Sequence, residues 1–498
     1  MQPAVSLVEA PDPKPAPVRR AAEPRRLAIN FLFLSGGECT AKLLTFASFS
    51  YLARTLGPWH YGLLEFTLAI MVFFTLPVDL GLGSYGAREI ARAPQNAARL
   101  LHEITGLRLM LALCSMVALV AFIAVIHKSV ELKMLLALYG LSLLGGPFLL
   151  QWFFQAHDQM HWVGIASIVR QAGFAVLVFL ICRGKSSLVL IGLVECVSVA
   201  AVGTFCVYIT RYKMHFAWPW PDIRLSRLMG HLREAFPIGL TELAWAFMWY
   251  FCTVLLGFIF ADVSLGWFGA SHRALMALHT FVWLYFFNLL PSISRCVALP
   301  VQQLLALMDR SICFAAWTGL FAVGFLSAFA PLLLTIIYGP AFRAATSSFT
   351  VLAWMLPVAM LSGHHRYILI AYNHQRMLLV CTAFSAVAAV VLGFLLVPLY
   401  GGVGAAWALL IANVLNFILV YLAVRRLVAE VPVHRQLAAP LAACALSFVV
   451  YRMLAGWNPW VAIAVSMALY LVCLIQTGNG DLALFVLSML RKPIASKA

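Results

Sequence analysis

The sequence predicts an all-α integral membrane protein of about 14 transmembrane helices, in two six-helix lobes plus a C-terminal pair. Three observations lead to this fold class. The 498 residues are 63% hydrophobic and only 10% charged, which is more apolar surface than a soluble domain can bury. Apolar stretches long enough to cross a hydrocarbon core of ~30 Å recur along the chain. The first and second halves also resemble each other weakly, as in carriers built from repeats.

Polar and Gly/Pro clusters divide the apolar chain into spans, and the longest polar interruption, 211–230, separates two groups of six. The first six spans are Ala28–Leu52, His60–Leu82, Glu103–Ile126, Met134–Phe154, Trp162–Cys182 and Leu188–Thr210. The next six are Leu232–Phe258, Val263–Leu290, Ser311–Ile337, Thr346–Ala371, Met377–Val397 and Val403–Val424, and the final pair is Ala438–Ala455 and Trp460–Gln476.

These spans predict a domain organisation in which basic polar segments alternate with membrane-embedded lobes. The predicted units are a basic cytoplasmic tail (1–26), an N-lobe (27–210), a cytoplasmic linker (211–230), a C-lobe (231–424), a cytoplasmic loop (425–437), the terminal helix pair (438–478) and a cytoplasmic tail (479–498).

The distribution of Lys and Arg predicts that both termini are cytoplasmic. Of the 34 basic residues, 22 fall in segments that this orientation places inside, 7 outside, and 5 within spans. Cytoplasmic loops keep such an excess, so the net charge of +16 requires no nucleic-acid partner. The 11 cysteines lie almost entirely in apolar segments and are expected to be core residues, not disulfides or metal ligands.

The two six-span blocks repeat each other at two places. The first helix of each carries a Glu at a similar depth, Glu38 in one and Glu242 in the other. At the outer turn, the segment 56–62 (LGPWHYG) corresponds to 261–268 (ADVSLGWF). Repeated halves are typical of carriers that open alternately to each side of the membrane.

Charges at mid-depth in the spans are the main candidates for a functional site, because each costs several kcal/mol in a bilayer. Glu38 lies ~15 Å and Lys42 ~21 Å into the first helix, and Glu242 and Arg273 each lie ~15 Å into theirs. Glu38 and Lys42 are four residues apart, so one interpretation is a pair that neutralises itself. The other is a cavity between the halves that presents cations to an anion such as a diphosphate.

Five other charges in the spans are consistent with structural roles. Arg170 and Glu195 lie at mid-depth on consecutive helices and are expected to form an internal ion pair, with a substrate contact as the alternative. Arg108 and Arg366 lie near cytoplasmic helix ends and are expected to snorkel to the interface. Asp79, at the inner end of the second helix, is consistent with a solvated end, a gate partner for an Arg, or a proton or sodium site.

No metal or cofactor site is expected. The segment 157–161 (HDQMH) has zinc-peptidase spacing but carries Asp where that motif needs Glu, and it has no evident third ligand. The pair His364–His365 at an inner helix end is expected to be interfacial. No outer loop is long enough to hold a glycosyltransferase or polymerase site, so an enzyme is not expected.

Several motifs gather in the first two helices and the loop that follows: KLLTF at 42–46, LARTLGP at 52–58, DLGL at 79–82 and YGAREIAR at 85–92. With them, residues 30–92 resemble the polysaccharide-export branch of the multidrug/oligosaccharidyl-lipid/polysaccharide exporter superfamily, which includes O-antigen flippases. Related lipid II flippases usually carry an Arg where this chain has Ser48. A lipid II flippase and a drug/cation antiporter of the same superfamily are the alternatives within transport.

The resemblance implies two lobes around a basic cavity in a bacterial inner membrane. It implies that the cavity carries an undecaprenyl-diphosphate-linked oligosaccharide to the outer leaflet for surface polysaccharide synthesis. The implied partners are this lipid-linked sugar, membrane lipids, a proton or sodium ion, and polysaccharide polymerase machinery. The candidate substrate contacts are Lys42, Arg273 and Arg54, and the candidates for ion coupling or gating are Glu38, Glu242 and Asp79.

Overall fold

The computed structural model describes residues 24–222, 225–260 and 263–479, and every regular element in this part of the chain is helical. Twelve helical stretches are long and apolar enough to cross a membrane. Two of them, Gly36–Arg92 with 57 residues and Gln375–Leu427 with 53, would be ~80 Å long if straight, far more than one span needs. Each is a pair of spans, which confirms the predicted count of about 14. Most of the two predicted tails lies outside the described residues.

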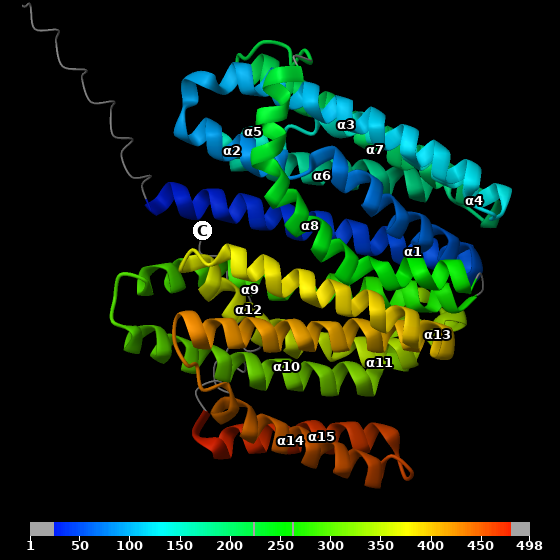
Figure 1. Ribbon diagram of the computed structural model, residues 1–498. Coiled ribbons are helices and arrows are strands. Elements are labelled where there is room, and N and C mark those ends of the chain that lie inside the picture. The colour runs from blue at the N-terminus through cyan, green and yellow to red at the C-terminus, as the bar shows by residue number, and fades with distance from the viewer. Residues whose placement is uncertain (1–23, 223–224, 261–262, 480–498) are drawn as a thin grey trace, which may run out of the picture.

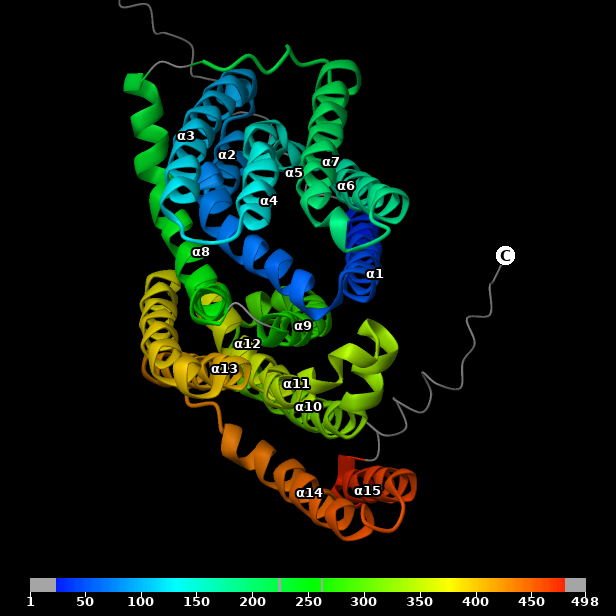
Figure 2. The ribbon, with the colours of Figure 1, turned by 90° about the vertical axis from the view of Figure 1, so that its right-hand side faces the viewer.

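Two glycines turn these long stretches back on themselves. In α1 (Pro24–Asp79), Gly57 has φ 72° and ψ 170°, and in α13 (Gln375–Leu427), Gly401 has φ 56° and ψ −131°. Residues other than glycine rarely adopt these backbone angles, because their Cβ atom would clash with the backbone. At the second turn a Cβ on Gly404 would collide with the carbonyl oxygen of Leu396, eight residues earlier, so the chain has reversed there. Figure 2 shows the two halves of α1 meeting at a sharp angle.

The N-terminal helices surround the two halves of α1. The third and fourth predicted spans appear as α3 and as a broken span in which a 3₁₀ segment containing Pro147 joins two α-helices. Such a break is tolerated at membrane depth where protein surrounds the freed backbone groups. The elements are α2 (Leu82–Arg92), α3 (Ala97–Val125), α4 (Val130–Gly140), η2 (Leu141–Phe148), α5 (Gln151–Ala156), α6 (Met160–Ile181) and α7 (Leu188–Tyr208).

The later helices form a second group, which Figures 1 and 2 show beside the first, with the final pair at its far side. That pair is fixed to α10 by Tyr470, whose hydroxyl donates to the Trp317 carbonyl at 2.9 Å. The elements are α8 (Leu225–Ile259), α9 (Val263–Cys296), α10 (Val301–Tyr338), α11 (Thr346–Ala353), α12 (Met355–Ala371), α13, α14 (Val433–Leu454) and α15 (Pro459–Leu474).

Helix α8 contacts both groups. Near its start, His231 bonds to Tyr85 of α2 at 2.8 Å and to Glu103 of α3 at 2.9 Å. Near its end, Cys252 lies against Ala389 and Gly393 of α13. The helix that opens the second half of the sequence is therefore held near its N-terminal end by the N-terminal group and near its C-terminal end by α13.

Candidate functional site

Two adjoining chambers lie at the centre of the molecule. The first, which we call the N-lobe chamber, has a volume of about 630 Å³ and is lined mainly by α1, η2, α5, α6 and α7. The second, which we call the inter-lobe chamber, has a volume of about 540 Å³ and lies between α1 and the helices α8, α9, α12 and α13. Thr45, Leu68, Tyr250 and Arg273 line both chambers, so the two spaces meet at these side chains.

The chambers are closed at the helix ends predicted to face outward. There α1 and α9 touch through glycines: a Cβ on Gly62 would lie 2.8 Å from the Gly266 nitrogen. Both glycines belong to the repeated outer-turn motifs. At the opposite ends, the walls include Asp79 and Ser84 in the N-lobe chamber and Arg366 in the inter-lobe chamber. The polar space therefore extends from mid-depth toward the predicted cytoplasmic side.

An ion pair crosses from one lobe to the other in the walls of the chambers. Arg273 of α9 donates through Nε to Glu65 Oε1 at 2.5 Å and through Nη2 to Glu65 Oε2 at 2.8 Å. Its guanidinium lies 3.6 Å from the ring centroid of Phe49. Arg273 therefore lines both chambers, as the sequence predicted for a cavity cation, but a carboxylate already neutralises it. Sequence reasoning missed Glu65, although a carboxylate inside a span was the signal that marks it.

The remaining charges of the inter-lobe chamber are unpaired. Glu38 and Lys42 form no ion pair within 4 Å, and Glu38 instead accepts a hydrogen bond of 2.7 Å from Ser167 Oγ. Within the described part of the chain, Lys42, Glu242 and Arg366 make neither hydrogen bonds nor ion pairs. Arg366 is exposed near the end of α12 and also lines the chamber, so the expectation that it snorkels stays a prediction. Two unpaired cations and two carboxylates thus share this space.

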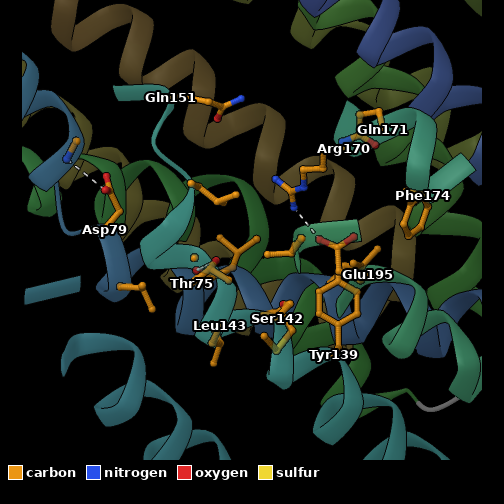
Figure 3. Close-up of a pocket in the computed structure, with 18 of the residues that line it drawn as sticks. Thr75, Asp79, Tyr139, Ser142, Leu143, Gln151, Arg170, Gln171, Phe174 and Glu195 are labelled. Carbon is orange, nitrogen blue, oxygen red and sulfur yellow. Dashed lines mark hydrogen bonds and ion pairs between the residues drawn. The ribbon is translucent and has the colours of Figure 1, made fainter. Parts of the chain in front are cut away.

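The charges of the N-lobe chamber are paired (Figure 3). The predicted ion pair between Arg170 and Glu195 is confirmed, with Nη2 to Oε1 at 2.7 Å. Asp79 pairs with Nη2 of Arg108 and also accepts from the Gly83 amide at 3.2 Å. The expectation that Arg108 snorkels is wrong, because its side chain is only 8% exposed and is held by Asp79.

Three other sequence candidates lie away from the chambers. Arg54 donates to the carbonyl oxygens of Ile336 and Ile337, at 2.9 Å for the latter, and so joins α1 to the end of α10. His364 and His365 are fully buried in the second group of helices, so the expectation that they are interfacial is wrong. Burial follows from α12 packing against α9 and α13 on both sides, which the sequence of one helix does not reveal.

Comparisons with known proteins give the chain its family. Residues 27–297, more than half of the chain, match the family described as "Polysaccharide biosynthesis protein". The chain belongs to this family. It is 22% identical over 402 residues to a protein of Escherichia coli (strain K12) named "Putative O-antigen transporter", which covers 80% of this chain and 96% of that protein. A Shigella dysenteriae protein of the same name is 24% identical over 212 residues, covering 42% of this chain and 52% of that protein.

The fold is also similar to that of solved membrane transporters. The lipid II flippase MurJ in an inward closed conformation matches with a TM-score of 0.72 at 15% identity, covering 90% of this chain and 99% of that one. An inward-facing multidrug transporter of the MATE family matches with a TM-score of 0.65 at 16% identity, over 82% and 98%. The family match includes Lys42, Glu65 and Arg273, while Arg366 lies beyond it.

Proposed function

We propose that this family member is a flippase that moves a lipid-linked oligosaccharide, carried on undecaprenyl diphosphate, from the inner to the outer leaflet by alternating access. The observation that carries the proposal is the pair of cations, Lys42 and Arg366, that line the inter-lobe chamber without a carboxylate partner in the described part of the chain. Unpaired charges there are costly unless they meet water or a ligand, and a diphosphate supplies the opposite charge. The names of the relatives, O-antigen transporter and lipid II flippase, support the same class of substrate.

The Glu65–Arg273 pair supplies a trigger for opening. Arg273 lines the same chamber as Lys42 and Arg366, so a diphosphate that enters this chamber can compete with Glu65 for the guanidinium. Losing that pair removes a strong contact between α1 and α9 on the closed side. The lobes then separate at the outer ends and close at the inner ends, which presents the sugar to the outer leaflet.

Ion coupling is assigned to Glu38 and Glu242. Both carboxylates line the inter-lobe chamber, at equivalent places in the sequence repeat, and neither is held by a cation. They can therefore take up a proton or a sodium ion when the anionic substrate has left. Asp79 is not assigned to coupling, since Arg108 already neutralises it. Arg54 is assigned to the closure of the outer ends.

The cellular setting follows from the same proposal. The excess of basic residues in alternate loops favours an orientation with both termini cytoplasmic. The relatives from Escherichia coli and Shigella dysenteriae favour a bacterial inner membrane. In that orientation the chambers open toward the leaflet in which lipid-linked sugars are assembled. A polysaccharide polymerase on the outer side is the expected consumer of the product.

The test is transport in proteoliposomes with a fluorescent polyprenyl-diphosphate-linked oligosaccharide. Lys42→Glu and Arg366→Glu should each lower the rate by about tenfold or more, because each removes a charge-assisted contact and adds repulsion. Arg435→Glu, an exposed basic residue outside both chambers, is the matched control. Unchanged transport by both chamber variants would refute the binding site. Transport of lipid II, measured in the same assay, distinguishes a carrier of peptidoglycan precursors from a carrier of lipid-linked oligosaccharides.

A drug/cation antiporter is the second candidate, and one observation favours it. The inter-lobe chamber carries the aromatic side chains Trp245, Tyr250 and Trp283 beside the unpaired Glu242. Such a wall can bind an organic cation. If this function holds, efflux of a fluorescent organic cation should fall about tenfold in Glu242→Gln, while the lipid-linked sugar is not transported at all.

A further inference from the structure

The N-lobe chamber is polar without offering a free charge. Gln151, Gln171, Tyr139 and Ser142 line it, and Figure 3 shows their side chains around the ion pair of Arg170 and Glu195. Its second ion pair, between Arg108 and Asp79, lies toward the inner end. A diphosphate could bind a cation in this chamber only by breaking one of these ion pairs. The lining instead suits a neutral group with many hydroxyls, which needs donors and acceptors side by side.

The polar lining is costly if it serves only to pack helices. Glu195 and Ser142 are 6% and 7% exposed, and their helices could have met through apolar side chains, as elsewhere in this lobe. Polar side chains at mid-depth in a membrane protein usually face a water-filled or ligand-filled space. A volume of about 630 Å³ is in the range of about 300–1,000 Å³ typical of small-ligand pockets.

The N-lobe chamber adjoins the proposed diphosphate site. The two chambers share the side chains of Thr45, Tyr250 and Arg273, so one ligand can extend from one into the other. A hydrogen-bond chain also joins them: Gln151 Nε2 donates to Ser167 Oγ at 3.2 Å, and Ser167 Oγ donates to Glu38 at 2.7 Å. Gln151 lines one chamber and Glu38 the other.

We infer that the N-lobe chamber is the subsite for the saccharide of the substrate, with the diphosphate in the inter-lobe chamber. This inference rests on the proposed function and deepens it. The amides of Gln151 and Gln171 each offer a donor and an acceptor to sugar hydroxyls. The chamber selects for a short, neutral saccharide. A charged sugar would have to replace one member of the Arg170–Glu195 or Arg108–Asp79 ion pair.

The experiment compares two ligands on the full chain in nanodiscs: polyprenyl diphosphate without sugar, and the same lipid carrying a neutral oligosaccharide. Gln171→Leu keeps the approximate size of the side chain and removes its hydrogen-bonding groups. No hydrogen bond to another residue is lost, since Gln171 has no hydrogen-bond partner within the described residues. Gln303→Leu, at an exposed position on α10 outside both chambers, is the matched control. Gln171→Asn tests whether a retained amide rescues binding.

Gln171→Leu should weaken binding of the sugar-bearing lipid by about tenfold, leave the sugar-free lipid unchanged, and be partly rescued in Gln171→Asn. Equal loss for both lipids, or loss for neither, would overturn the saccharide subsite while leaving the diphosphate site intact. If the unmodified protein binds neither lipid, the proposed function itself fails. Thermal unfolding of each variant, matched to Gln303→Leu, separates a folding defect from a binding defect.

Discussion

Arg273 and Glu65 form a two-point ion pair, at 2.5 and 2.8 Å, that joins α9 to the second half of α1. The Glu65 side chain is only 6% exposed and that of Arg273 22%. A pair this buried specifies the alignment of two elements, because removing one partner leaves a charge without compensation. Here the two elements belong to different lobes, so the pair stabilises one conformation of the carrier relative to another.

Glu65→Gln should destabilise the state with closed outer ends. The change leaves Arg273 buried without its counter-charge, at a cost of about 3–5 kcal/mol. We expect a lower temperature of thermal unfolding in detergent, with partial recovery in the double variant Glu65→Gln/Arg273→Gln. The control is Glu89→Gln, which breaks surface pairs with Arg88 and Arg92 and should change little. Equal effects of Glu65→Gln and the control would mean that the pair does not stabilise this state.

Gly266→Ala should prevent the outer ends from closing. A Cβ at this position would collide with the carbonyl oxygen of Pro58, a backbone atom that cannot move aside. We expect a longer distance between spin labels at Val130 and Ile336, which are exposed at the outer ends of the two lobes. Gly324→Ala is the matched control, because a Cβ there meets nothing within 4 Å. An unchanged label distance in Gly266→Ala would show that the glycine contact does not govern closure.

Arg54→Ala separates closure from substrate binding. Its guanidinium bonds the carbonyl oxygens of Ile336 and Ile337 and lines neither chamber. Because the side chain is exposed, we expect a loss of at most about 1 kcal/mol in stability. Affinity for the lipid-linked oligosaccharide, measured in nanodiscs, should stay unchanged. A large loss of affinity would show that Arg54 contacts the substrate.

The membrane spans were predictable from the sequence because each depends on local composition. The repeat also paired Glu38 with Glu242, and both line one chamber. Pairing between distant helices was not predictable in the same way. Glu65 meets Arg273 only after two lobes dock, and Arg366 enters the chamber only because of how α12 packs. A span's sequence gives the depth of a charge, whereas its direction depends on neighbours that the sequence does not name.

Tyr470→Phe tests whether the terminal helix pair takes part in transport. The Tyr470 hydroxyl donates to the Trp317 carbonyl, and its ring lies 5.3 Å from the Trp317 ring, so the residue fixes α15 to α10. Removing the hydroxyl costs about 1 kcal/mol, mostly by leaving a buried carbonyl unpaired. We expect faster proteolysis in the turn at 428–432, with transport unchanged, because neither residue lines a chamber. If transport falls as far as in Lys42→Glu, the terminal helices α14 and α15 move with the lobes during transport. Tyr470 lies far from the chambers, so its loss can affect transport only through α10.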